Sequence, residues 1–232
     1  LEWGLVDELA PPTEFNDAVG RRAAVLAATS TRLDGEPASL SPLRISVEQD
    51  SINYTSVSLK LADTHAELTV SVERTSDWLL QTARELDDAL CRLRFDFPEI
   101  GSLILRTEGL TEDAAALDQE LRLSEDNLQL ETALLWRRCL SRLDLMSKTL
   151  VAAIEPGSCF VGVLLELALA ADRTFMLEGR FEEQMVPLAP ASIRVTESNL
   201  GRLPMWNGLS RLASRLWGDE DSLGRISEAL NR

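Results

Sequence analysis

The stretch Glu155–Leu177, EPGSCFVGVLLELALAADRTFML, decides the fold of this chain. An apolar run, Leu150–Ile154, precedes it and predicts a buried strand. The chain then turns through Pro156 and Gly157, both of which favour turns. The aliphatic run after this turn predicts an apolar helix that carries one carboxylate, Glu166. A strand, a glycine-containing turn and a helix in this order are typical of an α/β fold.

A β-hairpin and an amphipathic helix are expected upstream of this stretch. Ser56–Asp63 and Glu67–Glu73 alternate apolar and polar residues, which is the pattern of half-buried strands. The short segment between them predicts a hairpin, and we place His65 in its turn. Apolar residues recur at helical spacing along Asp77–Arg94, which predicts an amphipathic helix.

A second buried strand is predicted at Gly101–Arg106, followed by helical structure over Thr111–Met146. The connection from Gly101–Arg106 to Leu150–Ile154 is long enough for a crossover, so we expect these two strands to be parallel neighbours. A further strand and two amphipathic helices should follow towards the C-terminus. Strands that alternate with helices after a leading hairpin predict the α/β class.

The N-terminal residues are expected to form a segment of their own. Pro11–Thr13 interrupts the chain, and Thr13 can cap a following helix. The apolar face of that helix would hold Phe15, Val19, Ala23 and Leu26. Residues 31–42 are rich in Gly, Pro and Ser and predict a linker. We therefore divide the chain into residues 1–30, a linker at 31–44 and a unit at 45–232.

Composition excludes several classes of function. The chain has 232 residues, of which 45% are hydrophobic and 26% charged, and its net charge is −15. This charge argues against a nucleic-acid surface. The single histidine argues against a metal site built from several histidines, and the three cysteines fit reduced thiols in the cytoplasm. The longest apolar run, Cys159–Ala171, is too short to span a membrane.

Several of these segments resemble the crotonase (enoyl-CoA hydratase/isomerase) superfamily. Residues 1–27, with their WGLVDE turn, resemble the end of one crotonase-like unit, and residues 45–232 resemble most of a second. The resemblance implies a crotonase-like spiral of β-β-α repeats with C-terminal helices. The end of one such unit thus precedes the beginning of another, and the chain starts with Leu1 rather than Met. We therefore expect it to be part of a longer protein.

The resemblance also implies the site residues. Glu166 precedes Asp172, and Glu197 precedes Gly201 and Pro204, as the two catalytic glutamates of the superfamily do. The residue whose backbone N–H holds the thioester oxyanion falls on Val163, and Gly162 stands before it. The second donor of the superfamily lies in a Gly-Ala-rich loop, but residues 107–119 read TEGLTEDAAALDQ and lack that pattern. We therefore expect this unit to be degenerate, with the working active site in a preceding unit.

The details ARELDDAL (residues 83–90), LRTEG (105–109) and PMWNGLSRLA (204–213) resemble a lyase branch of the superfamily. Its members use water to open the ring of an epoxidised aromatic CoA thioester, which yields formate and a CoA-bound semialdehyde. This implies an acyl-CoA substrate, no separate cofactor and no metal, and assembly into a homo-oligomer. An ordinary enoyl-CoA hydratase or isomerase, and a module that only mediates interactions, remain the alternatives.

Each candidate residue also has a purely structural interpretation. Glu166 can be paired with an arginine or with backbone amides, and Glu197 can cap the turn that it begins. Cys159 can be an inert buried thiol rather than a nucleophile. The cluster Arg137, Arg138 and Arg142 can be a solvated face rather than a site for CoA phosphates.

Overall fold

The computed structural model describes residues 1–30, 38–123, 126–179 and 190–230. They fall into two compact units, Leu1–Pro37 and Ala38–Arg232. The division lies within the stretch predicted as a linker, of which residues 31–37 are outside the described residues.

The first unit contains one helix, α1 (Phe15–Ala28), among its described residues. Its N-cap is Glu14, whose side chain makes no capping hydrogen bond, so the prediction that Thr13 caps this helix is wrong. The predicted apolar face is largely exposed to solvent: Phe15 is 56% exposed, Val19 53% and Leu26 57%. Ala18 is the helix residue that is buried. The described part of this unit therefore forms no hydrophobic core of its own.

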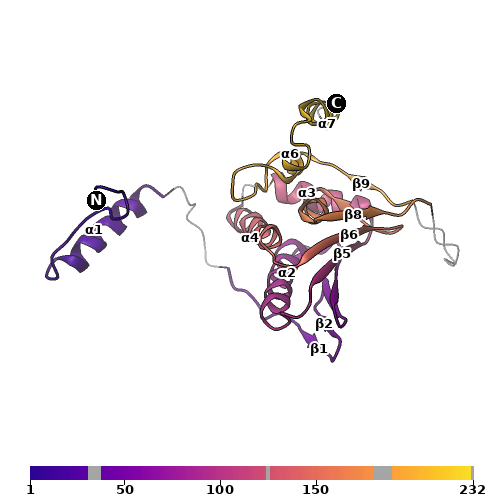
Figure 1. Ribbon diagram of the computed structural model, residues 1–232, viewed down its shortest axis with the longest axis horizontal. Coiled ribbons are helices and arrows are strands. Elements are labelled where there is room, and N and C mark those ends of the chain that lie inside the picture. Colours follow the sequence, from indigo (N-terminus) through magenta and orange to yellow (C-terminus); the bar gives the residue numbers. More distant parts are fainter. Residues whose placement is uncertain (31–37, 124–125, 180–189, 231–232) are drawn as a thin grey trace. The chain divides into compact units, whose positions relative to one another are not determined.

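The second unit is built on a seven-stranded sheet in the order β1-β2-β3-β4-β5-β6-β8 (Figure 1). The first four strands pair antiparallel, whereas β4, β5, β6 and β8 pair parallel. This mixed α/β architecture confirms the predicted fold class. The strands are β1 (Ser46–Val47), β2 (Ser51–Asn53), β3 (Val57–Leu61), β4 (His65–Ser71), β5 (Ser102–Glu108), β6 (Thr149–Ile154) and β8 (Arg173–Met176).

The register of the sheet confirms two predictions and corrects a third. Strands β3 and β4 form the expected hairpin, with Leu59 opposite Leu68. Strands β5 and β6 are the expected parallel neighbours, with Leu103 opposite Leu150. His65 is the first residue of β4 rather than a turn residue, because its pairing with Ser102 of β5 extends the strand to that point.

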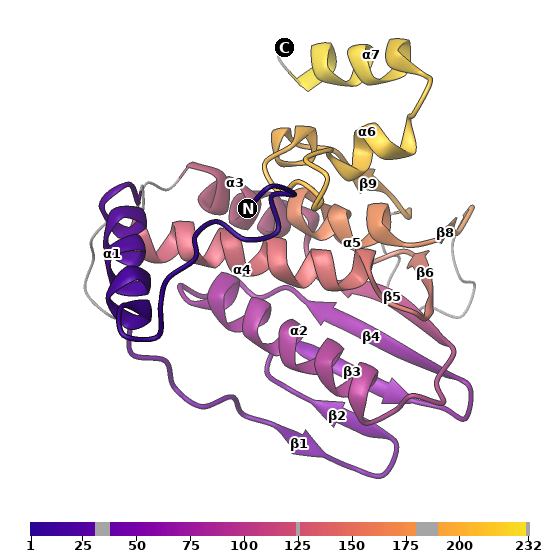
Figure 2. The same ribbon diagram turned by 60° about the vertical axis from the view of Figure 1, so that its left-hand side comes forward.

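Two long helices cover one face of this sheet (Figures 1 and 2). They are α2 (Trp78–Phe95), where a helix was predicted, and α4 (Asn127–Asp144). Trp78 and Trp136 stack between them, with ring centroids 6.2 Å apart, and the Trp136 indole N–H donates to the Leu79 carbonyl at 3.0 Å. Both rings are buried, and fully burying a large apolar side chain contributes about 1.5–3 kcal/mol to the core.

The predicted helical region at Thr111–Met146 is divided into two helices, α3 (Thr111–Leu123) and α4. Asp126 is the N-cap residue of α4, and its carboxylate accepts from the backbone N–H groups of Leu128 and Gln129. Residues 124 and 125 lie outside the described residues.

The sequence predicts that the chain passes directly from the turn after β6 into a helix, and this prediction is wrong. The chain forms a short strand β7 (Phe160–Val161), a 3-10 turn η1 (Gly162–Leu164) and only then the short helix α5 (Leu165–Ala170). Gly162 has φ of +51°, a left-handed conformation that an α-helix excludes. The rest of the unit comprises β9 (Ile193–Arg194), which pairs with β7, the 3-10 turn η2 (Glu197–Leu200), α6 (Arg211–Arg215) and α7 (Glu220–Leu230).

Candidate functional site

Glu166 lies in the first turn of α5 and is buried, with 2% of its side chain exposed. Both of its carboxylate oxygens have protein donors. Oε1 accepts from the Asn199 side-chain amide at 2.7 Å, and Oε2 accepts from Arg211 at 3.0 Å. Burial raises the pKa of Glu166, and the hydrogen bond from Asn199 and the charge of Arg211 oppose this shift.

Arg211 is the cation at the centre of this buried cluster. It is 1% exposed, and its guanidinium meets Asp144 of α4 through two hydrogen bonds, at 2.9 and 2.6 Å. It also donates to the Leu203 carbonyl at 2.9 Å. A planar guanidinium suits this arrangement because it can serve two carboxylates at once. Arg211 therefore ties α6 to α4 and α5.

Asn199 connects Glu166 to the turn where the helix begins. Its Nδ2 also donates to the Gly162 carbonyl at 2.9 Å, and its Oδ1 accepts from the Thr196 backbone N–H at 3.0 Å. Thr196 and Asn199 form the capping box of η2. Asn199 is completely buried, so the short turn η2 inserts one polar side chain directly against Glu166.

The backbone N–H of Val163, the expected oxyanion donor, already has a partner. It donates to Oδ1 of Asp118 at 2.8 Å, and Oδ2 of the same carboxylate accepts from the Thr196 hydroxyl at 2.8 Å. Asp118 belongs to α3 and is 2% exposed. A Cβ atom added to Gly162 would lie far inside van der Waals contact with this carboxyl group. Residues 107–119 lack the second oxyanion donor, and Asp118 of this stretch binds the first donor, the Val163 N–H.

Glu197 lies on the other side of η2 and is turned towards solvent, with 47% of its side chain exposed. It forms an ion pair with Arg122 of α3. A second ion pair, between Glu112 and Arg194, joins the same two segments at 2.7 Å. Glu197 therefore belongs to a surface clamp between α3 and the β9–η2 segment.

The structure brings three of the four predicted site residues together. Gly162, Val163 and Glu166 share one buried network, in which Gly162 bonds to Asn199, Val163 to Asp118 and Glu166 to both Asn199 and Arg211. The described contacts of Glu197 lie outside that network. Sequence reasoning missed Asp118, Asn199 and Arg211, although two signals were available. Asp118 lies on the apolar face of its helix with Ala114, Leu117 and Leu121, and Asn199 completes the capping-box pattern of residues 196–199.

Cys159 has the surroundings of a structural cysteine. It is buried, its backbone N–H donates to the Thr107 hydroxyl at 3.0 Å, and burial raises the pKa of its thiol to about 11. A thiol with so high a pKa contains little of the reactive thiolate at neutral pH.

The three arginines of α4 are engaged within the unit. Arg138 and Arg142 form ion pairs with Asp87 of α2, at 3.3 and 2.7 Å. Arg137 donates to the Pro204 carbonyl at 3.2 Å. These contacts stabilise the packing of α4 and support the structural interpretation of the cluster.

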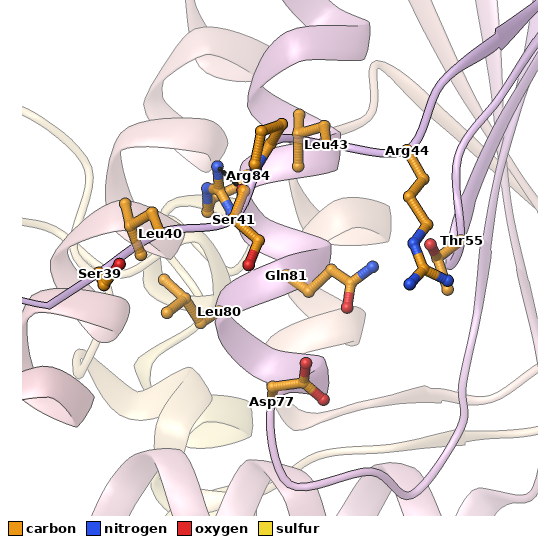
Figure 3. A pocket seen from close by; sticks show the side chains of 11 residues that line it. Ser39, Leu40, Ser41, Leu43, Arg44, Thr55, Asp77, Leu80, Gln81 and Arg84 are labelled. Atoms are coloured by element: carbon orange, nitrogen blue, oxygen red, sulfur yellow. Dashed lines mark hydrogen bonds between the residues drawn. The ribbon is translucent and has the colours of Figure 1, made fainter.

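A cavity of about 390 Å³ lies between residues 39–44 and helix α2 (Figure 3). Arg84 lies beside Ser41 in this view and donates to its carbonyl at 2.9 Å, while Arg44 reaches towards Thr55. None of the four predicted site residues lines this cavity.

Two further features are absent from the described residues. No group of three or more His, Cys, Asp or Glu side chains among them is arranged to hold a metal ion. No helix in the described part of the chain is long and apolar enough to cross a membrane.

No family model matches this chain. The curated benzoyl-CoA-dihydrodiol lyase of Aromatoleum evansii is 35% identical to it over 243 residues, which cover 97% of this chain and 42% of that protein. The chain therefore spans less than half the length of this relative.

Solved structures of two enoyl-CoA hydratases are also similar. The protein from Geobacillus kaustophilus aligns with a TM-score of 0.49 and 21% identity, over 79% of this chain and 62% of that one. The protein from Bacillus anthracis aligns with a TM-score of 0.46 and 17% identity, over 76% and 62%. Similarity at this level says nothing about activity.

The sequence comparison agrees with the lyase that the motifs of this chain resemble. Identity of 35% along 97% of the chain shows common descent with part of benzoyl-CoA-dihydrodiol lyase.

Proposed function

We propose that this chain is part of a CoA-thioester lyase, and that its second unit supports the fold of the enzyme without carrying out the chemistry. The relative that matches 97% of the chain is named for a benzoyl-CoA-dihydrodiol substrate. The reaction proposed for the whole protein is the opening of the ring of an epoxidised benzoyl-CoA by water, which releases formate and a dehydroadipyl-CoA semialdehyde. Coenzyme A enters as part of this substrate, so the proposal needs no separate cofactor and no metal.

The observation that carries the supporting role is the engagement of Glu166. A general acid or base must reach the substrate proton within hydrogen-bond distance. Both oxygens of Glu166 instead accept from buried protein groups, Asn199 and Arg211. Freeing this carboxylate would leave the Arg211 charge without one of its two acidic partners, which is costly in a buried site.

The oxyanion position supports the same role. A thioester oxygen would need the Val163 backbone N–H, which is held by Asp118. Glu197, the second candidate acid, is held in an exposed ion pair with Arg122. The described residues of this unit therefore offer neither a free proton carrier nor a free oxyanion donor at the positions that the superfamily uses.

We propose further that residues 1–30 are the end of a preceding crotonase-like unit and that residues 45–232 are most of a second one. The exposed apolar side chains of α1 support this proposal, because an amphipathic helix needs a partner to bury that face. The partner would be the remainder of the preceding unit.

We also propose that the protein assembles into a homo-oligomer through its crotonase-like units. Two tryptophans near the C-terminus support this: Trp206 is 74% exposed and Trp217 is 81% exposed. Exposed aromatic residues of this size are enriched where proteins associate.

The proposal is tested by turnover. The 232-residue chain and the Aromatoleum evansii lyase should be given epoxidised benzoyl-CoA, and the released formate should be measured. We expect the chain to be slower by at least about 10³-fold, the size of effect that follows from losing an oxyanion donor or a positioned acid. Equal rates of formate release would contradict the supporting role.

A second arm uses any longer protein that contains this chain and turns over the substrate. Glu166→Gln and Glu197→Gln should each lower its rate less than about tenfold, whereas loss of a catalytic acid costs about 10²–10⁴-fold. The unfolding midpoint of each variant separates loss of catalysis from loss of folded protein.

A further inference from the structure

We propose that the cavity between residues 39–44 and helix α2 binds a small zwitterion, with a phosphate monoester at one end and an ammonium group at the other. This inference is independent of the proposed lyase activity, because the cavity shares no lining residue with the network around Glu166. It gives a ligand class to a part of the unit that contains none of the candidate site residues.

Two arginines from different elements line this cavity (Figure 3). Arg84 comes from α2, and Arg44 comes from the segment that leads to β1. Arg84 donates to the Ser41 carbonyl at 2.9 Å, and neither arginine forms an ion pair within the described part of the chain. A guanidinium has five N–H donors, so most of those at this cavity are left for a ligand. The two charges match a phosphate monoester, which carries about −1.5 to −2 at neutral pH and binds guanidinium groups well.

A carboxylate lines the same cavity at some distance from Arg84. Asp77, Gln81 and Arg84 follow one another along one face of α2, because their spacing is four and then three residues. Asp77 and Arg84 are two turns apart, which is about 10 Å along the helix axis. The Asp77 side chain makes no capping hydrogen bond, so its carboxylate is left for a ligand. A cavity with two positive charges and a separate negative one matches a phosphate linked to an ammonium group.

A buried carboxylate positions two of the lining residues. Glu85 is fully buried, and its Oε1 accepts from the Gln81 side-chain amide at 2.9 Å and from the Thr55 N–H at 3.2 Å. Its Oε2 accepts from the Ser56 N–H at 2.8 Å. Because one buried group holds both the helix side and the strand side, the cavity has a defined shape before a ligand enters. Such preorganisation lowers the cost of binding.

The size of the cavity limits the ligand to a few carbon atoms. Its volume of about 390 Å³ lies near the lower end of the range for small-molecule sites, about 300–1,000 Å³. Leu40 and Leu80 also line it and offer apolar surface to the carbon atoms between the two charged ends.

The test titrates the 232-residue chain with phosphoethanolamine and with inorganic phosphate, and follows the amide resonances of Thr55 and Gln81. We expect both probes to shift these resonances saturably, and phosphoethanolamine to bind more tightly because its ammonium group pairs with Asp77. Arg44→Gln should weaken both probes about tenfold, as expected for the loss of a hydrogen bond to a charged group. Asp77→Asn should weaken phosphoethanolamine, which loses its partner, and strengthen inorganic phosphate, which loses a repulsive neighbour.

Three further variants separate binding from folding and from net charge. Arg44→Gln should leave the unfolding midpoint unchanged, because Arg44 makes no hydrogen bond among the described residues. Arg84→Gln also releases Ser41, so it is compared with Arg84→Lys, which keeps the charge and should retain more of the affinity. Arg94→Gln removes the same charge from the last turn of α2, outside the cavity, and should change neither affinity.

Absence of saturable shifts with both probes at millimolar concentrations would overturn the inference. Equal losses of affinity in Arg44→Gln and Arg94→Gln would also overturn it, since they would show a general charge effect. Tighter binding of CoA than of phosphoethanolamine at the same two resonances would assign the cavity to the acyl-CoA substrate instead. Formate release by the chain would overturn the proposed function and leave this binding result standing.

Discussion

Glu166 and Glu197 each match one of the two glutamates of the sequence motif, but they lie in opposite environments in the structure. The side chain of Glu166 is 2% exposed and accepts from Asn199 and Arg211, whereas that of Glu197 is 47% exposed and pairs with Arg122. One belongs to a closed buried network and the other to a surface clamp. A motif match therefore locates a carboxylate without saying whether it is free to act.

The contrast also separates two kinds of stabilisation. A buried charge depends on each of its partners, because solvent cannot replace them, while an exposed ion pair is screened and contributes about 0–1 kcal/mol. Substitutions in the two regions should consequently differ in size and in their response to salt and pH.

The largest effect is expected for Arg211→Met. This change leaves the buried Glu166 and the half-buried Asp144 without their shared cation, which should cost about 3–5 kcal/mol. Urea unfolding measures the loss. Arg215→Met is the matched control on the same helix, since Arg215 is exposed and donates only to backbone carbonyls among its described contacts. Equal losses in both variants would mean that the network does not depend on Arg211.

A smaller effect with a distinctive pH dependence is expected for Glu166→Gln. The substitution should cost about 1–3 kcal/mol, because either Asn199 or Arg211 loses the oxygen that accepts its hydrogen bond. Burial raises the pKa of Glu166, so the folded state holds this proton more tightly than the unfolded state. The stability that Glu166 contributes should therefore be greatest at low pH and fall as pH rises from the ordinary carboxyl value to the raised one.

This dependence is measured as the difference in unfolding free energy between the unchanged chain and Glu166→Gln, between about pH 4 and pH 8. We expect the difference to decrease with rising pH and then level off. An increase over the same range would show that the network lowers the pKa of Glu166 instead.

The smallest effect is expected for Glu197→Gln. Its exposed pair with Arg122 should contribute less than about 1 kcal/mol and should weaken in high salt. A double-mutant cycle with Arg122→Gln isolates the pair. A coupling energy above about 2 kcal/mol that salt does not reduce would place Glu197 in the same class as Glu166.

Much of the fold could be predicted because its signals are local. The alternation in β3 and β4, the apolar runs of β5 and β6 and the periodicity of α2 all lie within single elements. The length of the connection between β5 and β6 was enough to predict their parallel pairing. The 3-10 turn before α5 was missed because it depends on the conformation of one glycine, Gly162.

The partners of the candidate site could not be predicted in the same way. Val163 and Asp118 are 45 residues apart, and so are Glu166 and Arg211. No periodicity within one element relates such residues, and their meeting depends on how α3, α5 and α6 pack together. The sequence showed that residues 107–119 lack the donor pattern. It did not show that Asp118 of this stretch binds the Val163 N–H.

The most direct test of the central claim, that this unit is closed to a thioester, is a titration of the isotope-labelled chain with benzoyl-CoA. The amide resonance of Val163 reports whether a thioester oxygen replaces Asp118 at that N–H. We predict that this resonance does not move saturably up to millimolar benzoyl-CoA, which is the upper range of typical Michaelis constants. A saturable shift at Val163 that is lost when Asn199 and Glu166 are substituted would contradict the account and place a working acyl-CoA site in this unit.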